Sequence, residues 1–134
     1  MNKQLKTFLV DFDLNEPADR ASIHAVEEQL NFKFPEEYLN FLLFADGGEG
    51  SIGEAYLNLW RVEELIEDNE GYNVEEFAPG LLIIGSDGGG TAFCIDTRSP
   101  EKPLVSIPFI GMDLDEIEKI SNDFTGFIES LFQG

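Results

Sequence analysis

The chain has 134 residues, of which 43% are hydrophobic, enough for one domain with a substantial core and too apolar for a disordered chain. Its 27 acidic and 8 basic residues give a formal net charge of −19, which disfavours binding to nucleic acid or anionic membranes and favours a basic protein partner. The single cysteine, Cys94, excludes an internal disulfide, and no apolar run approaches the roughly 20 residues of a membrane span, so we expect a cytoplasmic protein.

The acids concentrate in the middle of the chain. Between Lys33 and Arg98 the only base is Arg61, for which we predict a structural ion pair. The middle section therefore presents a strongly negative face that would steer a basic partner toward it. The alternative explanation is that the acids serve only solubility.

Residues 1–16 form an N-terminal extension of uncertain role. Asp11, Asp13 and Asn15 resemble the start of a calcium loop, but Glu16 stands where such a loop needs glycine and Ser22 where it needs glutamate. We therefore do not expect calcium binding there.

Two helices follow. From Pro17, which suits a first helical turn, Ile23, Val26 and Leu30 recur at helical spacing, and His24 beside them is expected at the surface or its boundary. The second helix starts with Pro35 at its first position and ends at residues 46–48. Because it is apolar almost all round, we expect burial on more than one side.

The next elements alternate between strand and helix. After a loop at residues 47–53, a strand at 54–60 places Leu57 and Leu59 on one face and Tyr56, Asn58 and Trp60 on the other. A short helix at 62–71 turns its acids outward, as a solvated face.

The stretch 79–96 reads as two core strands joined by a glycine-rich turn, because the run 81–84 is apolar without alternation. A third strand covers 103–109, with Pro108 at its edge or end. Asp113 and Asp115 then open a helical turn. The chain closes with a helix that buries Phe124 and its neighbours and is capped by one of residues 121–123.

This order of elements predicts the fold class. Strands in series joined by turns favour antiparallel pairing, and the surrounding helices would cover one face of the sheet. The prediction is a single α+β domain over residues 1–134, with a twisted, mostly antiparallel sheet and helices packed on it.

Four segments carry a resemblance to a known family: FPEEYLNFLLFADGG, LNLWRVEELIEDN, PGLLIIGSDGGGTAFCID and NDFTGFIESL. In this order they resemble the SMI1/KNR4 family of the SUKH superfamily, over about residues 23–131. The resemblance implies an α+β domain. It also implies a non-enzymatic role, since bacterial members look like immunity proteins against toxins, many of them nucleases, and fungal members are regulatory interaction proteins.

The turn at residues 86–91 could in principle cradle a phosphate through backbone amides. It lacks the lysine of a P-loop, it leads into a strand instead of a helix, and Asp87 adds a negative charge. We therefore interpret it as a turn whose glycines admit close backbone approach.

The acids at loop ends could form a metal site or an acid/base pair, which would make the protein a carboxylate-based metal-dependent hydrolase. Their spacing singles out no pair, so we predict no cofactor, no metal and no catalytic residue. A regulatory scaffold without a toxin partner is a further alternative. Trp60 is either core or a binding residue. The carboxylates considered for the hydrolase are Asp46, Glu49, Glu54, Asp87 and Asp96, and the predicted partner-binding residues are Asp46, Glu49, Glu54, Tyr56, Trp60 and Asp87.

Overall fold

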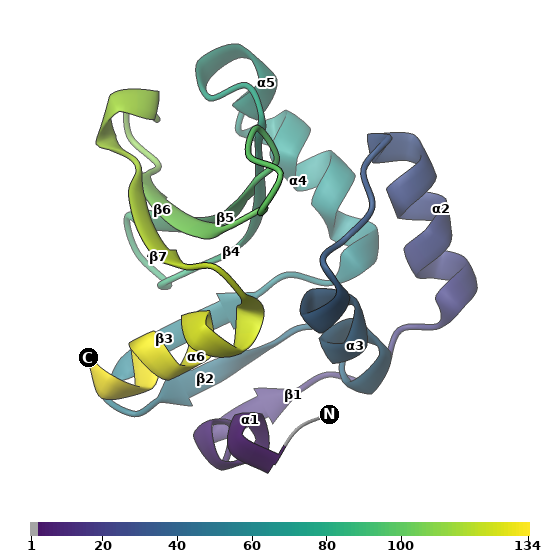
Figure 1. The fold of residues 1–134 in the computed structure, drawn as a ribbon, viewed down its shortest axis with the longest axis vertical. Helices are drawn as coiled ribbons and strands as arrows, with labels where there is room; N and C mark the ends of the chain where they lie inside the picture. Colours follow the sequence, from purple (N-terminus) through teal and green to yellow (C-terminus); the bar gives the residue numbers. More distant parts are fainter. Residues whose placement is uncertain (1–2) are drawn as a thin grey trace.

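The structure, a computed structural model, describes residues 3–134, and one seven-stranded sheet runs through this part of the chain (Figure 1). The strands lie in sequence order, and every neighbouring pair is antiparallel. Figure 1 shows β1–β3 crossing the lower half of the molecule while β4–β6 curve upward, so the sheet is strongly twisted. This confirms the predicted α+β fold with an antiparallel sheet. The strands are β1 Phe12–Leu14, β2 Gly48–Ile52, β3 Ala55–Leu59, β4 Leu81–Ser86, β5 Thr91–Asp96, β6 Leu104–Pro108 and β7 Glu118–Ser121.

The helices are short and amphipathic, and most of them pack on one face of this sheet. Figure 1 shows α6 crossing in front of β2 and β3, in contact with β2, and α2 standing beside α4. The helices are α1 Lys3–Phe8, α2 Arg20–Leu30, α3 Glu36–Phe44, α4 Leu65–Gly71, α5 Val74–Phe77 and α6 Phe124–Gln133, with 3-10 turns η1 Val62–Glu64 and η2 Leu114–Glu116.

The main core lies between these helices and the sheet, and it contains a cluster of phenylalanine rings. Phe124 of α6 lies 5.0 Å from Phe41 of α3 and 5.9 Å from Phe127, measured between ring centroids, and Phe127 lies 5.1 Å from Phe93 of β5. All four side chains are buried. Burying each ring contributes about 1.5–3 kcal/mol, so these aromatic contacts help to hold α3, α6 and β5 together.

A second, smaller core covers the opposite face of β4–β6. It contains Ile83, Cys94 and Ile107 from the strands and Val74 from α5, together with Met112. The expectation that helices cover only one face is therefore wrong. The run 81–84 lacks alternation because both faces of β4 are buried. Burial also raises the pKa of the Cys94 thiol.

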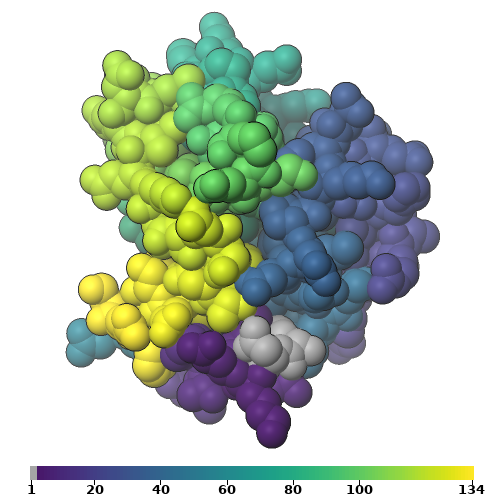
Figure 2. All heavy atoms as spheres, in the orientation of Figure 1, coloured from purple at the N-terminus to yellow at the C-terminus, as the bar shows by residue number. Residues whose placement is uncertain are grey.

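The N-terminal segment is built into the main core. Leu5, Leu9 and Phe12 are buried, and Phe8 lies against Phe132 of α6 with ring centroids 4.9 Å apart. Figure 2 shows this purple segment packed beside the yellow C-terminal helix at one end of the molecule. Residues 1 and 2 of the predicted extension lie outside the described residues.

The predicted loop at 47–53 is wrong, because most of it is strand β2, paired with β1 and β3. The strand was not recognised because glycines interrupt its side-chain pattern. Gly48 has φ +153°, and a Cβ atom there would lie 2.8 Å from the Phe12 ring. Close packing of β1 on β2 thus requires glycine at this position, and glycine is also the residue that weakens the alternating pattern by which a strand is recognised.

Two helix starts also differ from the prediction. Asp19 is the N-cap of α2, since its Oδ1 accepts the Ser22 N–H at 2.7 Å, and Pro17 lies before the helix instead of in its first turn. The hydrogen bonds that the Asp19 carboxylate accepts from Ser22 lower its pKa. Pro35 is likewise the residue before α3 rather than its first helical residue. The predicted cap of α6 is confirmed as Asp123, whose Oδ1 accepts the Gly126 N–H at 2.7 Å.

Candidate protein-binding surface

The acidic side chains of this chain have few basic partners. Among residues 3–134, Arg98 forms an ion pair with Asp96 at 2.9 Å, and the His24 Nε2 lies 3.0 Å from Oε1 of Glu28. His24 is exposed, as predicted. The predicted ion pair of Arg61 is wrong: Arg61 is exposed, and it lies within ion-pair distance of no described carboxylate.

Two of the lysines are engaged by aromatic rings. The Lys6 Nζ lies 5.8 Å from the centroid of the Phe44 ring, and the Lys102 Nζ lies 4.8 Å from that of Phe32. These cation–π contacts stabilise the two ammonium groups but do not neutralise any carboxylate. The negative charge of the surface is consequently left largely uncompensated within the described chain.

Asp46, the first predicted site residue, has an internal role. Its Oδ1 accepts the Val62 N–H at 2.7 Å, and its backbone binds Glu16 and Asn15, at 2.9 and 3.0 Å. Burial raises the pKa of this half-buried carboxyl, and the hydrogen bond from Val62 acts in the opposite direction. Asp46 thus fastens the start of η1 to the N-terminal segment and is not a free surface group.

Glu49 and Tyr56 lie together on the outer face of β2 and β3. The Tyr56 hydroxyl donates to Oε2 of Glu49 at 2.5 Å, and this hydrogen bond raises the pKa of Tyr56. Asp13 of β1 pairs directly with Glu49, so its side chain shares that face. Asp13, Glu49 and Tyr56 are all exposed and form what we call the outer acidic face.

The turn that carries Asp87 rests against this outer acidic face. Gly88 has φ +80°, and a Cβ atom there would lie 2.8 Å from the Tyr56 ring, so glycine is required for the approach of the ring. Oδ1 of Asp87 accepts the N–H groups of Gly89 and Thr91, at 2.8 and 3.1 Å. These amides are therefore engaged by the turn itself, which leaves few donors for a phosphate.

The remaining two predicted residues lie at opposite ends of β3. Glu54 is exposed in the turn between β2 and β3. Trp60 is half-buried and packs against both cores, stacked on Tyr72 with ring centroids 6.1 Å apart. The structure thus brings Glu49, Tyr56 and Asp87 together, whereas Trp60 mainly joins the two cores.

The five carboxylates considered for a hydrolase do not form one cluster, although Glu49 and Asp87 both lie near Tyr56. Asp96 is bound by the Arg98 guanidinium through two hydrogen bonds of 2.9 Å, which hold its pKa below its usual value. Asp46 and Asp87 bind backbone amides elsewhere. In residues 3–134 no three His, Cys, Asp or Glu side chains are arranged to hold a metal ion.

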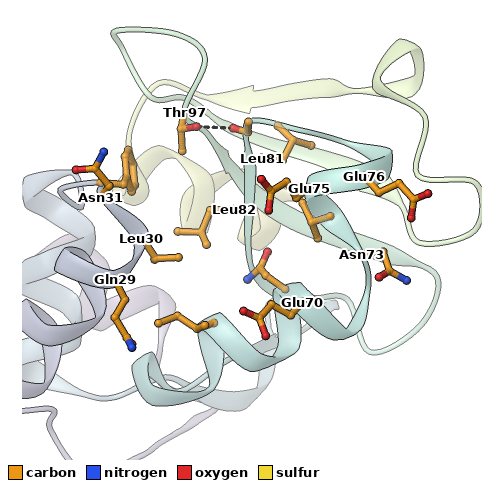
Figure 3. A pocket seen from close by; sticks show the side chains of 15 residues that line it. Gln29, Leu30, Asn31, Glu70, Asn73, Glu75, Glu76, Leu81, Leu82 and Thr97 are labelled. Carbon is orange, nitrogen blue, oxygen red and sulfur yellow. Dashed lines mark hydrogen bonds between the residues drawn. The ribbon is translucent and has the colours of Figure 1, made fainter.

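The surface also carries a groove that the sequence did not indicate. It has a volume of about 1040 Å³ and lies between the C-terminal end of α2 and the pair α4–α5, with β4 as its floor (Figure 3). We call it the α2–α4 groove. The charge run of the helix predicted at 62–71 was interpreted as a solvated face. One of its acids, Glu70, lines this groove together with Glu75 and Glu76 of α5.

The meander sheet is covered on both faces at β4–β6. Together with an acidic and largely unpaired surface, it defines a small α+β domain with a groove beside its central strands. The chain belongs to the SMI1 / KNR4 family (SUKH-1), whose profile matches residues 17–130. It is also similar to the "Uncharacterized protein YnaB" of Bacillus subtilis (strain 168), with 32% identity over 111 residues that cover 83% of this chain and 72% of that protein. The resemblance read from the four segments is confirmed, and α1 and β1 lie outside the family match.

Within residues 3–134, no helix has the length and apolarity needed to cross a bilayer.

Proposed function

We propose that this protein is a non-enzymatic protein-binding domain of the immunity type, which neutralises a cognate toxin in the cytoplasm by covering a basic surface of it. Family membership supports the immunity role, because bacterial members of this family resemble toxin-neutralising proteins. The single structural observation that carries the proposal is the surplus of exposed carboxylates without basic partners in the described chain.

Charge accounts for the choice of a basic partner. A nuclease domain needs positive surface to hold its nucleic acid, and an inhibitor with a formal charge of −19 is attracted to the same surface. Such complementarity raises association rates and rejects acidic partners, while the buried apolar contacts supply most of the affinity. The outer acidic face and the α2–α4 groove both offer carboxylates beside apolar or aromatic groups.

The proposal is tested by co-purification with the product of the neighbouring gene over a series of rising salt concentrations. We expect a complex with a toxin-like protein whose association rate falls as salt increases. A regulatory scaffold would instead have no toxin gene beside its own. The absence of any complex with the neighbouring product at low salt would contradict the immunity role.

A further inference from the structure

The α2–α4 groove has an apolar floor that the chain itself leaves partly open. Leu30 and Phe32 at the end of α2 and Ile66 of α4 are half-buried, and they face Leu82 of β4 across the hollow. Figure 3 shows Leu30 and Leu82 close to its centre. Covering such side chains is favourable, at about 25 cal/mol per Å² of apolar surface removed from water. The floor is therefore suited to receive apolar side chains from outside.

The two rims of the groove differ in charge. On the α4–α5 rim stand Glu70, Glu75 and Glu76, all exposed, whereas Gln29 and Asn31 on the α2 rim are neutral. Figure 3 shows the carboxylates of Glu70 and Glu75 turned into the hollow and that of Glu76 turned away from it. No lysine, arginine or histidine of the described chain lines the groove, and none of these carboxylates is in an ion pair. A ligand would thus meet uncompensated negative charge on one side only.

The floor is closed to a further β-strand. β3 pairs with β4 only at Gly85 and Ser86, so the edge of β4 at residues 81–83 has no neighbouring strand. The side chain of Asn69 takes that place: its Oδ1 accepts the Ile83 N–H at 2.8 Å, and its Nδ2 donates to the Ile83 carbonyl at 3.0 Å. The Leu81 N–H is also engaged, by the Ala78 carbonyl at 3.1 Å. Strand addition would have to displace Asn69.

We propose that the α2–α4 groove is the docking site for a segment of the basic partner protein that inserts apolar side chains between α2 and β4 and places lysine or arginine against the α4–α5 rim. This rests on the proposed function, because it says where the toxin binds. The segment is recognised by its side chains and not by β-sheet extension. A second copy of this chain is a poor occupant, since both copies carry a formal charge of −19.

The first experiment measures peptide binding by backbone amide NMR shifts of the full chain. The probe is a short peptide that carries two leucines and four lysines among serines, and its two controls replace either the leucines by serine or the lysines by glutamate. We expect saturable shifts confined to the residues that line the groove, at least about tenfold weaker binding of the leucine-free control, and no binding of the glutamate control. Shifts spread over the whole acidic surface, or equal binding of the leucine-free control, would overturn the proposal.

The second experiment separates the groove from the proposed function. The double variant Glu70→Lys/Glu75→Lys is compared with Glu116→Lys/Glu118→Lys, which makes the same change in net charge at exposed positions outside the groove. Both variants are checked for an unchanged thermal midpoint and then titrated with the peptide and with the product of the neighbouring gene. We expect the groove variant to lose at least about tenfold in affinity for both ligands and the control variant to lose about twofold or less.

The outcomes are distinct. If the neighbouring gene product binds both double variants equally well, the groove proposal is wrong and the proposed function stands. If that product does not bind the wild-type protein, the proposed function is wrong, and the peptide titration alone decides whether the groove accepts a basic apolar segment.

Discussion

Replacement of Asn69 by alanine tests the structural role that we assign to its side chain in closing the edge of β4. The amide makes three hydrogen bonds, two with Ile83 and one with the Leu65 carbonyl at 2.7 Å. Alanine would leave the N–H and C=O of Ile83, which is fully buried, without partners. Each such group costs about 1–3 kcal/mol. Because Asn69 itself is half-buried and lines the groove, its removal lets water approach Ile83, which places the sum near the lower end, at about 3 kcal/mol.

The expected net loss is somewhat smaller than that sum. Alanine is a better helix former than asparagine by about 0.5 kcal/mol, which leaves a decrease of about 2–3 kcal/mol in the free energy of unfolding. In a domain of this size that lowers the thermal midpoint by about 6–12 °C. Asn69→Asp, which keeps the acceptor oxygen but lacks the donor, should be at least as unstable as Asn69→Ala.

The matched control for this prediction is Asn40→Ala, at an exposed position of α3. It gains the same helix propensity without breaking a hydrogen bond to a strand, so its free energy of unfolding should rise slightly. Urea unfolding followed by circular dichroism measures both variants. The reasoning is refuted if the two variants differ by less than about 1 kcal/mol.

Three further predictions concern single polar groups, all measured by urea unfolding. Asp46→Ala should lower the free energy of unfolding by about 1–2 kcal/mol, because it removes the acceptor of the Val62 N–H. Asp46→Asn keeps an acceptor oxygen and should lower it by less than about 0.5 kcal/mol. Equal losses in the two variants would contradict the capping role. Tyr38→Phe should stabilise the protein by about 1 kcal/mol, because the Tyr38 hydroxyl is buried without a hydrogen-bond partner in the described chain; a loss of stability would show that the hydroxyl is satisfied. Arg98 lowers the folded-state pKa of Asp96, so this carboxylate contributes its full stability at pH values above its unfolded pKa of about 3.9. That stability is lost as the pH falls through the folded-state pKa. The difference in the free energy of unfolding between wild type and Asp96→Asn should therefore be present at neutral pH and vanish in strong acid.

The elements that the sequence predicted well are those whose own residues determine them. The hairpin of β4 and β5 follows from an apolar run, a glycine turn and a second run. The last helix follows from its apolar stripe and from Asp123 as cap. Both signals are local, so no distant segment had to be known.

The elements that the sequence missed depend on their neighbours. β1 has three residues and α5 has four, too few for any periodicity, and β7 carries no apolar alternation. β2 is a strand only because β1 and β3 pair with it, and its glycines serve that packing instead of marking a loop. For such segments the pairing partner decides the structure, and the partner is distant in sequence.

The features of the candidate site likewise fall into those that local sequence predicts and those that depend on distant segments. Alternation along β3 was sufficient to place Tyr56 on the face opposite Leu57 and Leu59, but the contacts of Tyr56 with Glu49 and the Asp87 turn come from sheet register. The internal bond from Asp46 to Val62 could not be foreseen from a loop-end position. The α2–α4 groove was invisible because its two walls are separate in the chain.

The central claim, that this protein protects a cell from a basic toxin by binding it, is tested most directly by a survival assay. The product of the neighbouring gene is expressed in cells with and without this protein, and with the Glu70→Lys/Glu75→Lys variant as comparison. We predict that the neighbouring product is toxic alone, that the wild-type protein restores growth, and that the variant restores it less well. A toxic neighbour that the wild-type protein fails to neutralise, or a neighbour without toxicity, would contradict the claim.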